Sequence, residues 1–461
     1  MFQIQPVYTP KVSEAILLII SILLTIFVSI FHFSSAPHLP ILFSILLLMG
    51  YGLIRNVSIN ELEKGLVDGS KSGIQAIFIF LLIGVLISSW LLSYTIPTIM
   101  FLGFELITPQ YFYAIIFVIT AVVGVSIGSS LTTVATLGVA FIGMAEALDL
   151  SLAITAGAIV SGSFFGDKMS PLSDTTNLAA SIVQVDLFEH IRNMSWTTVP
   201  AFVITFILFM FLSPSEVSTD FTKVITMKEI LMNSGSVQWS SLIPLVLLFV
   251  FIIFKIPAMF VLALSSLSAI ILAFVHQDGL TMSKLLTVLF DGYVSETGNE
   301  AIDSLLSRGG MNSMMFTISL VLLALGMGGL LFKLGIIPAI LEGIDQWLKK
   351  RSSVILACAC SAIGINVLAG EQYLSILLTG ESFKSHYKRV GLANKNLSRT
   401  LEDGGTVINP LVPWGVCGAF ITTVLGVPTL EYIPFAFFCL LSPIITILIG
   451  FTGWTLTTKS T

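Results

Sequence analysis

The stretch from Gly162 to Asn177 limits the fold of this chain more than any other part of the sequence. It reads Gly-Ser-Phe-Phe-Gly-Asp-Lys-Met-Ser-Pro-Leu-Ser-Asp-Thr-Thr-Asn, which brings two aspartates, a lysine and a proline into otherwise apolar sequence. The flanking segments, 153–161 and 178–185, consist mostly of apolar or small residues. Pro171 lacks a backbone donor, so a helix here breaks and leaves carbonyls that another group must satisfy. We therefore expect a broken helix that carries charged side chains inside an apolar layer.

Composition indicates that this apolar layer is a lipid bilayer. Hydrophobic residues make up 55% of the chain and charged residues only 10%, against about 25% charged residues in soluble domains. The apolar runs long enough for a membrane span of about 20 residues are Glu14–Phe33, Ile74–Leu92, Trp196–Leu212, Pro257–Phe274, Phe316–Phe332 and Tyr432–Phe451. Together with shorter apolar stretches they predict an all-α polytopic membrane protein with about ten to twelve crossings.

The distribution of Lys and Arg predicts how the chain is oriented in the membrane. The basic residues form three clusters, at Arg55/Lys64/Lys71, Lys349–Arg351 and Lys384–Arg399. Loops rich in Lys and Arg tend to be cytoplasmic, whereas 213–238 and 276–308 hold more acidic than basic residues. We therefore expect the three clusters on the cytoplasmic face of a multi-pass protein of the bacterial plasma membrane. Each cluster adjoins a predicted span, so we expect no nucleic-acid partner.

Other polar features favour structural roles. The charged residues of 56–72 favour a solvated loop, and Val-Asp-Leu-Phe-Glu-His-Ile-Arg at 185–192 favours a short amphipathic helix in the membrane interface. The four cysteines and five histidines form neither a Cys/His ligand group nor a HExxH motif. We therefore expect no transition-metal site and no resident cofactor. The absence of a nucleophile–base set or a nucleotide motif makes an enzyme the least favoured class.

Three short matches indicate that the chain contains an internal repeat. The matching pairs are Ile96–Ile99 with Ile337–Ile340, Val123–Val125 with Ile363–Ile365, and Met169–Leu172 with Ile408–Leu411, at offsets of 241, 240 and 239 residues. Repeats of this kind in membrane proteins are commonly inverted, with a binding site at their interface formed by discontinuous helices. We therefore predict two transmembrane repeats, 14–213 and 239–453, joined by a loop at 214–238.

Each predicted repeat contains a second interruption ahead of its break. The break in the second half is Leu401–Gly415, with a Gly pair, two prolines and two acids. The hairpin-like interruptions are Gly128–Thr133 in the first half and Ala369–Tyr373 in the second, where small or polar residues replace the expected leucines. We expect the breaks at 166–175 and 403–415 to face each other near the membrane midplane.

The motifs of both halves resemble one known family. Phe-Gly-Asp-Lys-Met-Ser-Pro-Leu-Ser-Asp-Thr-Thr at 165–176 resembles the signature of the NhaC family of sodium/proton antiporters. Gly-Glu-Gln at 370–372 and Asn-Pro-Leu-Val-Pro-Trp at 409–414 resemble the same family, and the resemblance extends over roughly 14–453. It implies two inverted repeats, each with a re-entrant hairpin and a broken helix. The hairpin departs from the family at Leu131, where relatives often carry Trp.

The resemblance also implies a set of site residues. By similarity these are Asp167, Ser170, Asp174, Thr175 and Thr176 in the first half, with Glu371, Asp403 and Asn409 in the second. Neighbouring hydroxyls of the same polar segments complete the candidate ion- or substrate-binding set, namely Ser129, Thr133, Ser173 and Thr406. The partners indicated are Na⁺, H⁺ and the lipid bilayer, and a homodimer remains open.

The residue types around Asp174 suit the exchange of a cation for a proton. Na⁺ is a hard cation that binds several oxygens, and Asp174, Thr175 and Thr176 are the Na⁺ ligands we expect. One carboxylate that holds either Na⁺ or H⁺ is sufficient for an antiporter. The alternative for Asp174 is a helix N-cap, because Asp before Thr-Thr-Asn and an apolar run is also a helix start signal.

The remaining charged residues leave alternatives open. Asp167 and Lys168 could pair with each other or with groups across the interface between the halves. Glu371 is either a functional acid or a solvated charge at the cytoplasmic end of a span. Glu402 and Asp403 point about 100° apart on a helix, so we expect Asp403 to face the cavity and Glu402 to face water.

Two functions remain after these arguments. The leading hypothesis is a secondary antiporter that exchanges Na⁺, or Li⁺, for H⁺. The second is a Na⁺- or H⁺-coupled carrier or exchanger of a small carboxylate such as malate or lactate, or of an amino acid, because some family members carry such cargo. In that case the N-termini of the broken helices would hold the substrate carboxylate. A channel is less favoured, because two asymmetric, acid-bearing breaks suit alternating access.

Overall fold

The apolar runs of the sequence form long helices, because inside a bilayer each segment must satisfy its own backbone hydrogen bonds. The computed structural model describes residues 4–33, 35–106, 109–214, 221–296, 303, 306–345 and 348–458. Within these residues seven helices are long and apolar enough to cross a membrane, or up to nine if each of two bent pairs is one span. Shorter apolar helices add to them at His38–Ile54, Thr95–Glu105, Phe112–Ile127 and Trp239–Ile253. The prediction of an all-α, multi-pass membrane protein is confirmed.

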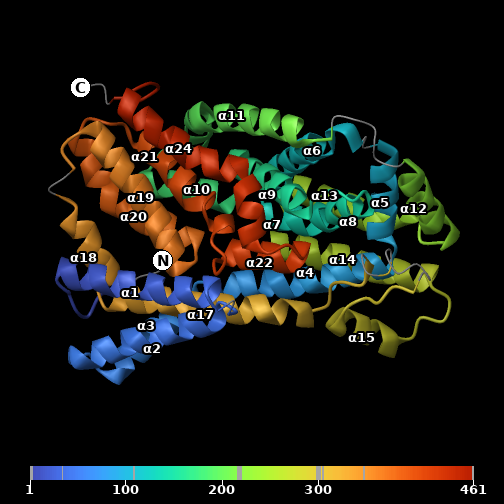
Figure 1. The fold of residues 1–461 in the computed structure, drawn as a ribbon, viewed down its shortest axis with the longest axis horizontal. Helices are drawn as coiled ribbons and strands as arrows, with labels where there is room; N and C mark the ends of the chain where they lie inside the picture. The colour runs from blue at the N-terminus through green and yellow to red at the C-terminus, as the bar shows by residue number, and fades with distance from the viewer. Residues whose placement is uncertain are drawn as a thin grey trace.

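Within its described residues, the first half of the chain forms eleven α-helices and one π-helical turn, arranged as in Figure 1. They are α1 (Val12–Phe31), α2 (His38–Ile54), α3 (Ile59–Lys71), α4 (Ile74–Leu92), α5 (Thr95–Leu106), α6 (Phe112–Ile127), α7 (Ser130–Thr133), the π-helical η2 (Val134–Gly138), α8 (Val139–Ala147), α9 (Leu152–Met169), α10 (Asp174–Val183) and α11 (Leu187–Leu212). The predicted loop at 214–238 contains α12 (Phe221–Asn233), while 215–220 lie outside the described residues.

The described residues of the second half form a further series of helices. They are α13 (Ile243–Ile253), α14 (Ala258–His276), α15 (Met282–Asp291), α17 (Met315–Lys333), α18 (Ile336–Gly343), α19 (Arg351–Ala369), α20 (Gln372–Arg389), α21 (Asn394–Leu401), the π-helical η6 (Glu402–Thr406), α22 (Val416–Leu425), α23 (Thr429–Tyr432) and α24 (Phe437–Thr452). Short 3-10 turns lie between helices of both halves, at η1 (Pro109–Tyr111) in the first and at η3 (Trp239–Leu242), η4 (Asn312–Met314), η7 (Asn409–Leu411) and η8 (Ile433–Phe435) in the second.

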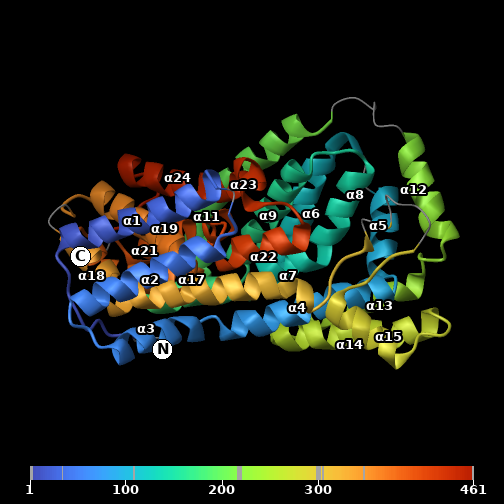
Figure 2. The same cartoon turned by 60° about the horizontal axis from the view of Figure 1, so that its bottom comes forward.

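The two halves place corresponding helices in the same order. The pairs α4/α17, α5/α18, α6/α19, α9/α21 and α10/α22 begin 239 to 242 residues apart. Packing between the halves is reciprocal: α3 of the first half lies along α17, and α14 of the second half lies along α4 (Figures 1 and 2). Such an exchange is compatible with inverted repeats that bury one another's faces.

The segment 56–72 is not the solvated loop that its charges suggest, because most of it forms α3. Ser58 caps this helix by accepting a hydrogen bond from the Glu61 N–H at 3.3 Å, as in a capping box. Glycines let α3 approach α17 closely: a Cβ on Gly69 would lie 2.3 Å from the Leu325 carbonyl oxygen. Lys333 of α17 also reaches Glu61 at 2.5 Å. α3 therefore packs on α17 through a face of buried Leu62 and two glycines, Gly65 and Gly69.

The segment 185–192 is likewise not a separate interfacial helix. Asp186 caps α11 by accepting from the Phe188 and Glu189 N–H groups, and the helix then continues without a break to Leu212. His190 in its first turns is fully buried. Between Arg192 and the apolar run the sequence Asn-Met-Ser contains no Pro or Gly, so nothing ends the helix there.

Candidate functional site

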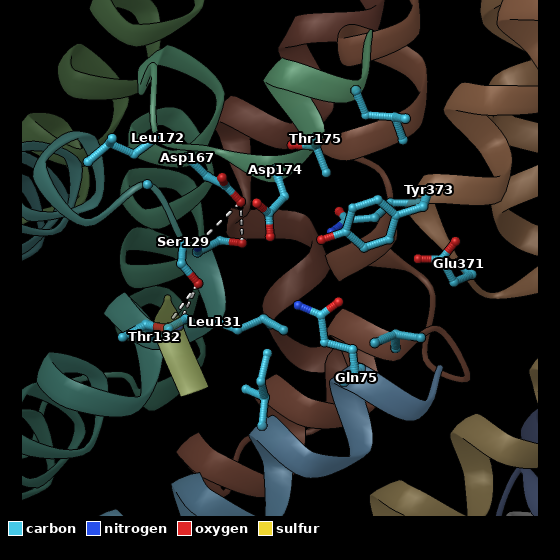
Figure 3. Close-up of a pocket in the computed structure, with 18 of the residues that line it drawn as sticks. Gln75, Ser129, Leu131, Thr132, Asp167, Leu172, Asp174, Thr175, Glu371 and Tyr373 are labelled. Carbon is cyan, nitrogen blue, oxygen red and sulfur yellow. Dashed lines mark hydrogen bonds between the residues drawn. The ribbon is translucent and has the colours of Figure 1, made fainter. Parts of the chain in front are cut away.

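A cavity of about 1060 Å³ opens where polar segments of both halves meet. Its walls come from the first turn of α4, the hairpin before α7, the start of α10, the turn between α13 and α14, and α20. Figure 3 shows the carboxylates of Asp167 and Asp174 directed into the same space, with Ser129 beside them and Gln75 and Tyr373 across it. The cavity therefore collects oxygen-bearing side chains from segments far apart in sequence.

The hairpin of the first half is held by its glycine. Gly128 ends α6 with φ of 70°, and Ser129 then caps α7 through the Thr132 N–H at 3.3 Å. A Cβ on Gly128 would lie 2.8 Å from the Cβ of Leu172, so the hairpin tip packs directly on the first break. Only glycine adopts this conformation and this contact without strain.

Asp167 joins the hairpin to the end of α9. Its Oδ2 accepts hydrogen bonds from the Ser130 N–H at 3.2 Å and the Ser130 hydroxyl at 2.7 Å. The first N–H groups of a helix have no partner within the helix, and this carboxylate satisfies one of them. Asp167 is only 5% exposed yet lines the cavity. Its carboxylate therefore serves the backbone on one side and faces the cavity on the other.

Asp174 is the first residue of α10 and not its cap. Ser173 is the N-cap, because its hydroxyl accepts from the Thr176 N–H at 3.4 Å. The Asp174 side chain is exposed to the cavity, and the Thr175 hydroxyl beside it is 3.1 Å from the Ser173 hydroxyl. The alternative of a cap for Asp174 is therefore wrong.

Three other predicted residues of the first half serve the backbone and do not line the cavity. The Ser170 hydroxyl accepts from the Leu172 N–H at 3.2 Å. The Thr133 hydroxyl donates to the Ser129 carbonyl at 2.9 Å, and the Thr176 hydroxyl donates to the Lys168 carbonyl at 3.2 Å. These bonds fix the break and the hairpin, whereas Asp167, Asp174, Thr175 and Ser129 present oxygens to the cavity.

Glu371 occupies the hairpin position of the second half. Gly370 ends α19 with φ of 67°, and Glu371 caps α20 by accepting from the Leu374 N–H at 2.7 Å. The side chain is buried and lines the cavity. It is therefore not the solvated charge of the alternative interpretation, and it repeats in the second half the capping role that Ser129 has in the first.

The charged residues of the second break do not reach the cavity. Lys168 of α9 forms an ion pair with Asp403 of η6, and both side chains are 0% exposed. The Thr446 hydroxyl of α24 donates to the same carboxylate. Glu402 is also fully buried. The expectation that Asp403 faces the cavity and Glu402 faces water is therefore wrong, whereas pairing of Lys168 across the halves is observed.

Asn409 and Thr406 also lie away from the cavity. The Asn409 Oδ1 accepts from the Cys417 N–H at 2.7 Å, and its Nδ2 donates to the Asn366 Oδ1 at 2.7 Å. Asn366 in turn donates to the Gly405 carbonyl. Thr406 is fully buried. This amide network holds the second break against α19, and neither Asn409 nor Thr406 lines the cavity.

The residues of the site that the sequence did not predict include Ser130, Gln75 and Tyr373. Ser130 holds Asp167, and its position directly after the capping Ser129 is the signal that could have identified it, because the first N–H groups of a helix need a partner. Gln75 stands alone as an amide in the apolar run of α4, which is itself a mark of function in a membrane helix. Tyr373 gave no signal, because an aromatic residue near a span end is ordinary.

Comparison with known proteins places this chain among transporters. The sequence model described as the Na⁺/H⁺ antiporter family matches residues 162–454. The chain is similar to a Na⁺/H⁺ antiporter NhaC of Alkalihalophilus pseudofirmus, with 44% identity over 438 residues and 95% of each chain covered. It is also similar to a Na⁺/H⁺ antiporter NhaC of Bacillus subtilis, with 42% identity over 95% of this chain and 97% of the relative.

A relative with other cargo matches over a similar length. The malate-2H⁺/Na⁺-lactate antiporter of Bacillus subtilis is 34% identical over 95% of this chain and 94% of its own.

Proposed function

The chain belongs to the Na⁺/H⁺ antiporter family, and we propose that it exchanges Na⁺ for H⁺ across the bacterial plasma membrane by alternating access. The observation that carries the proposal is the pair of carboxylates at the first break, Asp167 and Asp174, which share one cavity between the two halves. Both NhaC relatives are named for the same exchange. Acids at membrane depth are functional by default, since placing each one there costs about 2.5–3.5 kcal/mol.

The proposed Na⁺ site is the oxygen cluster at the start of α10. Asp174 supplies a carboxylate with the cavity in front of it, and Thr175 and Ser129 add hydroxyls. Asp167 contributes the carboxylate oxygen that does not bind Ser130. Protonation of these carboxylates at low pH removes ligands for Na⁺ on that side of the membrane. Exchange by Na⁺ should therefore weaken as pH falls.

We further propose that the described conformation opens toward the cytoplasm. The cavity extends to the turn at Ser72 and Gly73, directly after Lys71, and to Glu381 and Lys384 of α20. Both places belong to basic clusters, and basic loops favour the cytoplasmic side. The Na⁺ site would thus load from inside the cell before the halves rearrange.

The dimensions of the cavity support a second candidate function. A volume of about 1060 Å³ is at the upper end of pockets that hold organic ligands, about 300–1,000 Å³, and far exceeds the needs of one ion. Lys255 and Lys384 line it together with Gln75 and Tyr373. A small carboxylate would find both charge and hydrogen-bond donors there, and the malate/lactate relative is named for such cargo.

Transport in proteoliposomes separates the two candidates. Vesicles under an imposed pH gradient are tested with Na⁺, Li⁺, K⁺, lactate, malate and amino acids. Na⁺/H⁺ exchange requires that Na⁺ alone dissipates the gradient, and that Asp174→Asn abolishes this response. Asp278→Asn, the same change at an exposed position between α14 and α15, is the matched control. No response to Na⁺ or Li⁺, with a response to an organic acid or amino acid, would establish the second candidate instead.

A further inference from the structure

A second group of buried charges lies behind the cavity, around η6. Lys168, Glu402 and Asp403 are each 0% exposed, and none of them lines the cavity. Lys168 follows Asp167 directly in α9, so successive residues of one helix serve the cavity and this buried group. The structure thus contains two separate sets of ionisable side chains at the meeting point of the halves.

Glu402 is the member of this group that lacks a partner. Neither of its carboxylate oxygens has a hydrogen-bond partner among the described residues. The Thr406 hydroxyl, four residues on in η6, interacts with it but also lacks a hydrogen bond of ordinary geometry. Asp403 beside it takes both the Lys168 ammonium and the Thr446 hydroxyl. One lysine therefore serves one of two adjacent acids.

The surroundings of Glu402 decide its charge. The charged groups that act on it are Lys168 and Asp167 of α9 and Asp403 next to it in the chain. Lys168 is already neutralised by Asp403, and the other two are acids. A carboxylate that is buried without a partner takes up a proton, because the ionised form has lost its hydration without compensation. The lack of a partner for the Glu402 carboxyl group is therefore the geometry expected of its protonated, uncharged form.

We propose that Glu402 holds a proton at this buried position, apart from the cavity acids, and that this proton is the one exchanged for Na⁺. The second clause rests on the proposed function. The proton comes from hydronium, which leaves as water when the new O–H bond forms on the Glu402 carboxylate. Release is the reverse: the O–H bond breaks, water accepts the proton, and the carboxylate is left.

The ion pair between Lys168 and Asp403 provides a way for Na⁺ binding to release the proton from Glu402. Lys168 is on the same turn of α9 as Asp167, so a shift of that turn when Na⁺ occupies the cavity moves both side chains. If the Lys168 ammonium approaches Glu402, the ionised form gains the partner that it lacks. Na⁺ bound at one set of acids thereby drives a proton off the other. π-helical turns such as η6 occur frequently at functional sites.

Infrared spectroscopy locates the proton without reference to transport. The purified wild-type protein should show a protonated-carboxyl band at neutral pH whose intensity falls when Na⁺ is added. Glu402→Gln should remove this band, whereas Glu342→Gln, the same change on an exposed glutamate of α18, should keep it. A band that persists unchanged in Glu402→Gln overturns the proposal. A band that Glu402→Gln removes, but that does not respond to Na⁺ in the wild type, overturns the exchange role.

Flux measurements then test whether the proton is transported. In proteoliposomes, Glu402→Gln should retain counterflow of radioactive sodium at equal pH on both sides but lose Na⁺-driven proton flux. Proton flux at the wild-type rate, or loss of counterflow in a folded variant, would overturn a separate proton site. If Glu402→Gln does not fold, Glu402→Asp keeps a carboxyl and should shift the infrared band. Absence of counterflow in the wild type would reject the proposed function and leave the infrared test valid.

Discussion

The broken helices of the two halves use one backbone device with different side chains. Asp167 and Asn409 stand 242 positions apart, the same interval as the starts of α9 and α21. Both side chains accept from a helical N–H, Asp167 from Ser130 and Asn409 from Cys417. A carboxylate only accepts and keeps an oxygen for a cation, whereas an amide also donates and closes its own network. At these two matched positions the first half therefore presents a carboxylate oxygen to the cavity, whereas the second half ties its amide into a hydrogen-bond network.

The largest effect should come from breaking the ion pair between the two breaks. Lys168→Met removes the ion-pair partner of the buried Asp403 carboxylate and leaves the Thr446 hydroxyl as its hydrogen-bond donor. Removing one partner of a buried pair costs about 3–5 kcal/mol. The free energy of unfolding of the purified protein in detergent should fall by about that amount, as measured by denaturant titration.

The matched variant removes both charges. Lys168→Met combined with Asp403→Leu replaces the pair by apolar side chains, an exchange that is often neutral or stabilising. The double variant should therefore recover most of the stability that the single variant loses. Equal instability of both variants would mean that this ion pair does not hold the two breaks together.

Replacing the two hairpin glycines by alanine should cause the next largest loss of stability, and the two variants compare the halves directly. Gly128 and Gly370 share a left-handed conformation, with φ of 70° and 67°, which costs another residue about 1–2 kcal/mol. A Cβ on Gly128 would meet Leu172 at 2.8 Å, whereas on Gly370 the nearest atoms lie at 3.2 Å. Overpacking adds about 1–3 kcal/mol, so Gly128→Ala should lower thermal stability more than Gly370→Ala. Equal losses would show that the Gly128 contact relaxes freely.

An acid introduced into the second break should lower thermal stability by less than the preceding substitutions. Asn409→Asp removes the amide that donates to the Asn366 Oδ1 and sets two acceptors against each other. Asn366 cannot reverse its amide without losing its bond to the Gly405 carbonyl. A buried acceptor without a donor costs about 1–3 kcal/mol, measurable as a loss of thermal stability. Asn233→Asp at the exposed end of α12 is the control, and an equal loss there would refute the argument.

The membrane spans, the first break and the polar hairpin could be predicted from the sequence, because each depends on local composition. The apolar runs gave the spans, and Pro171 with its neighbouring acids marked the first break. The polar hairpin marked Ser129, which lines the cavity. Each of these signals is local, because a proline or a charge in apolar sequence acts on its own helix.

Side-chain direction in the second break could not be predicted in the same way. The expected directions of Glu402 and Asp403 assumed that this segment has one face in water, but η6 is surrounded by α9, α10, α19, α20, α21 and α24, and all its residues are buried. The partner of Asp403 lies 235 positions away in the chain. The charges of 56–72 favoured a loop over α3, whose buried face of Leu62, Gly65 and Gly69 becomes evident only in its contact with α17.

The smallest effect concerns a surface cluster outside both breaks. Asp345, between α18 and α19, contacts His386 at 2.5 Å and Arg389 at 3.0 Å. The hydrogen bond from His386, and then that from Arg389, hold the pKa of the Asp345 carboxyl below its usual range. A lowered pKa stabilises the fold at pH values above the unfolded pKa, about 3.9, and this contribution is lost as pH falls through the folded pKa.

Asp345→Asn should therefore leave stability nearly unchanged in acid and lower it slightly at neutral pH, as measured by thermal unfolding in detergent. Because the Asp345 carboxyl itself titrates only below about pH 4, its titration cannot cause a change in wild-type transport between about pH 5 and 8. If Asp345→Asn shifted the transport profile in that range as strongly as Asp174→Asn, the surface cluster would have to be counted among the groups that control exchange.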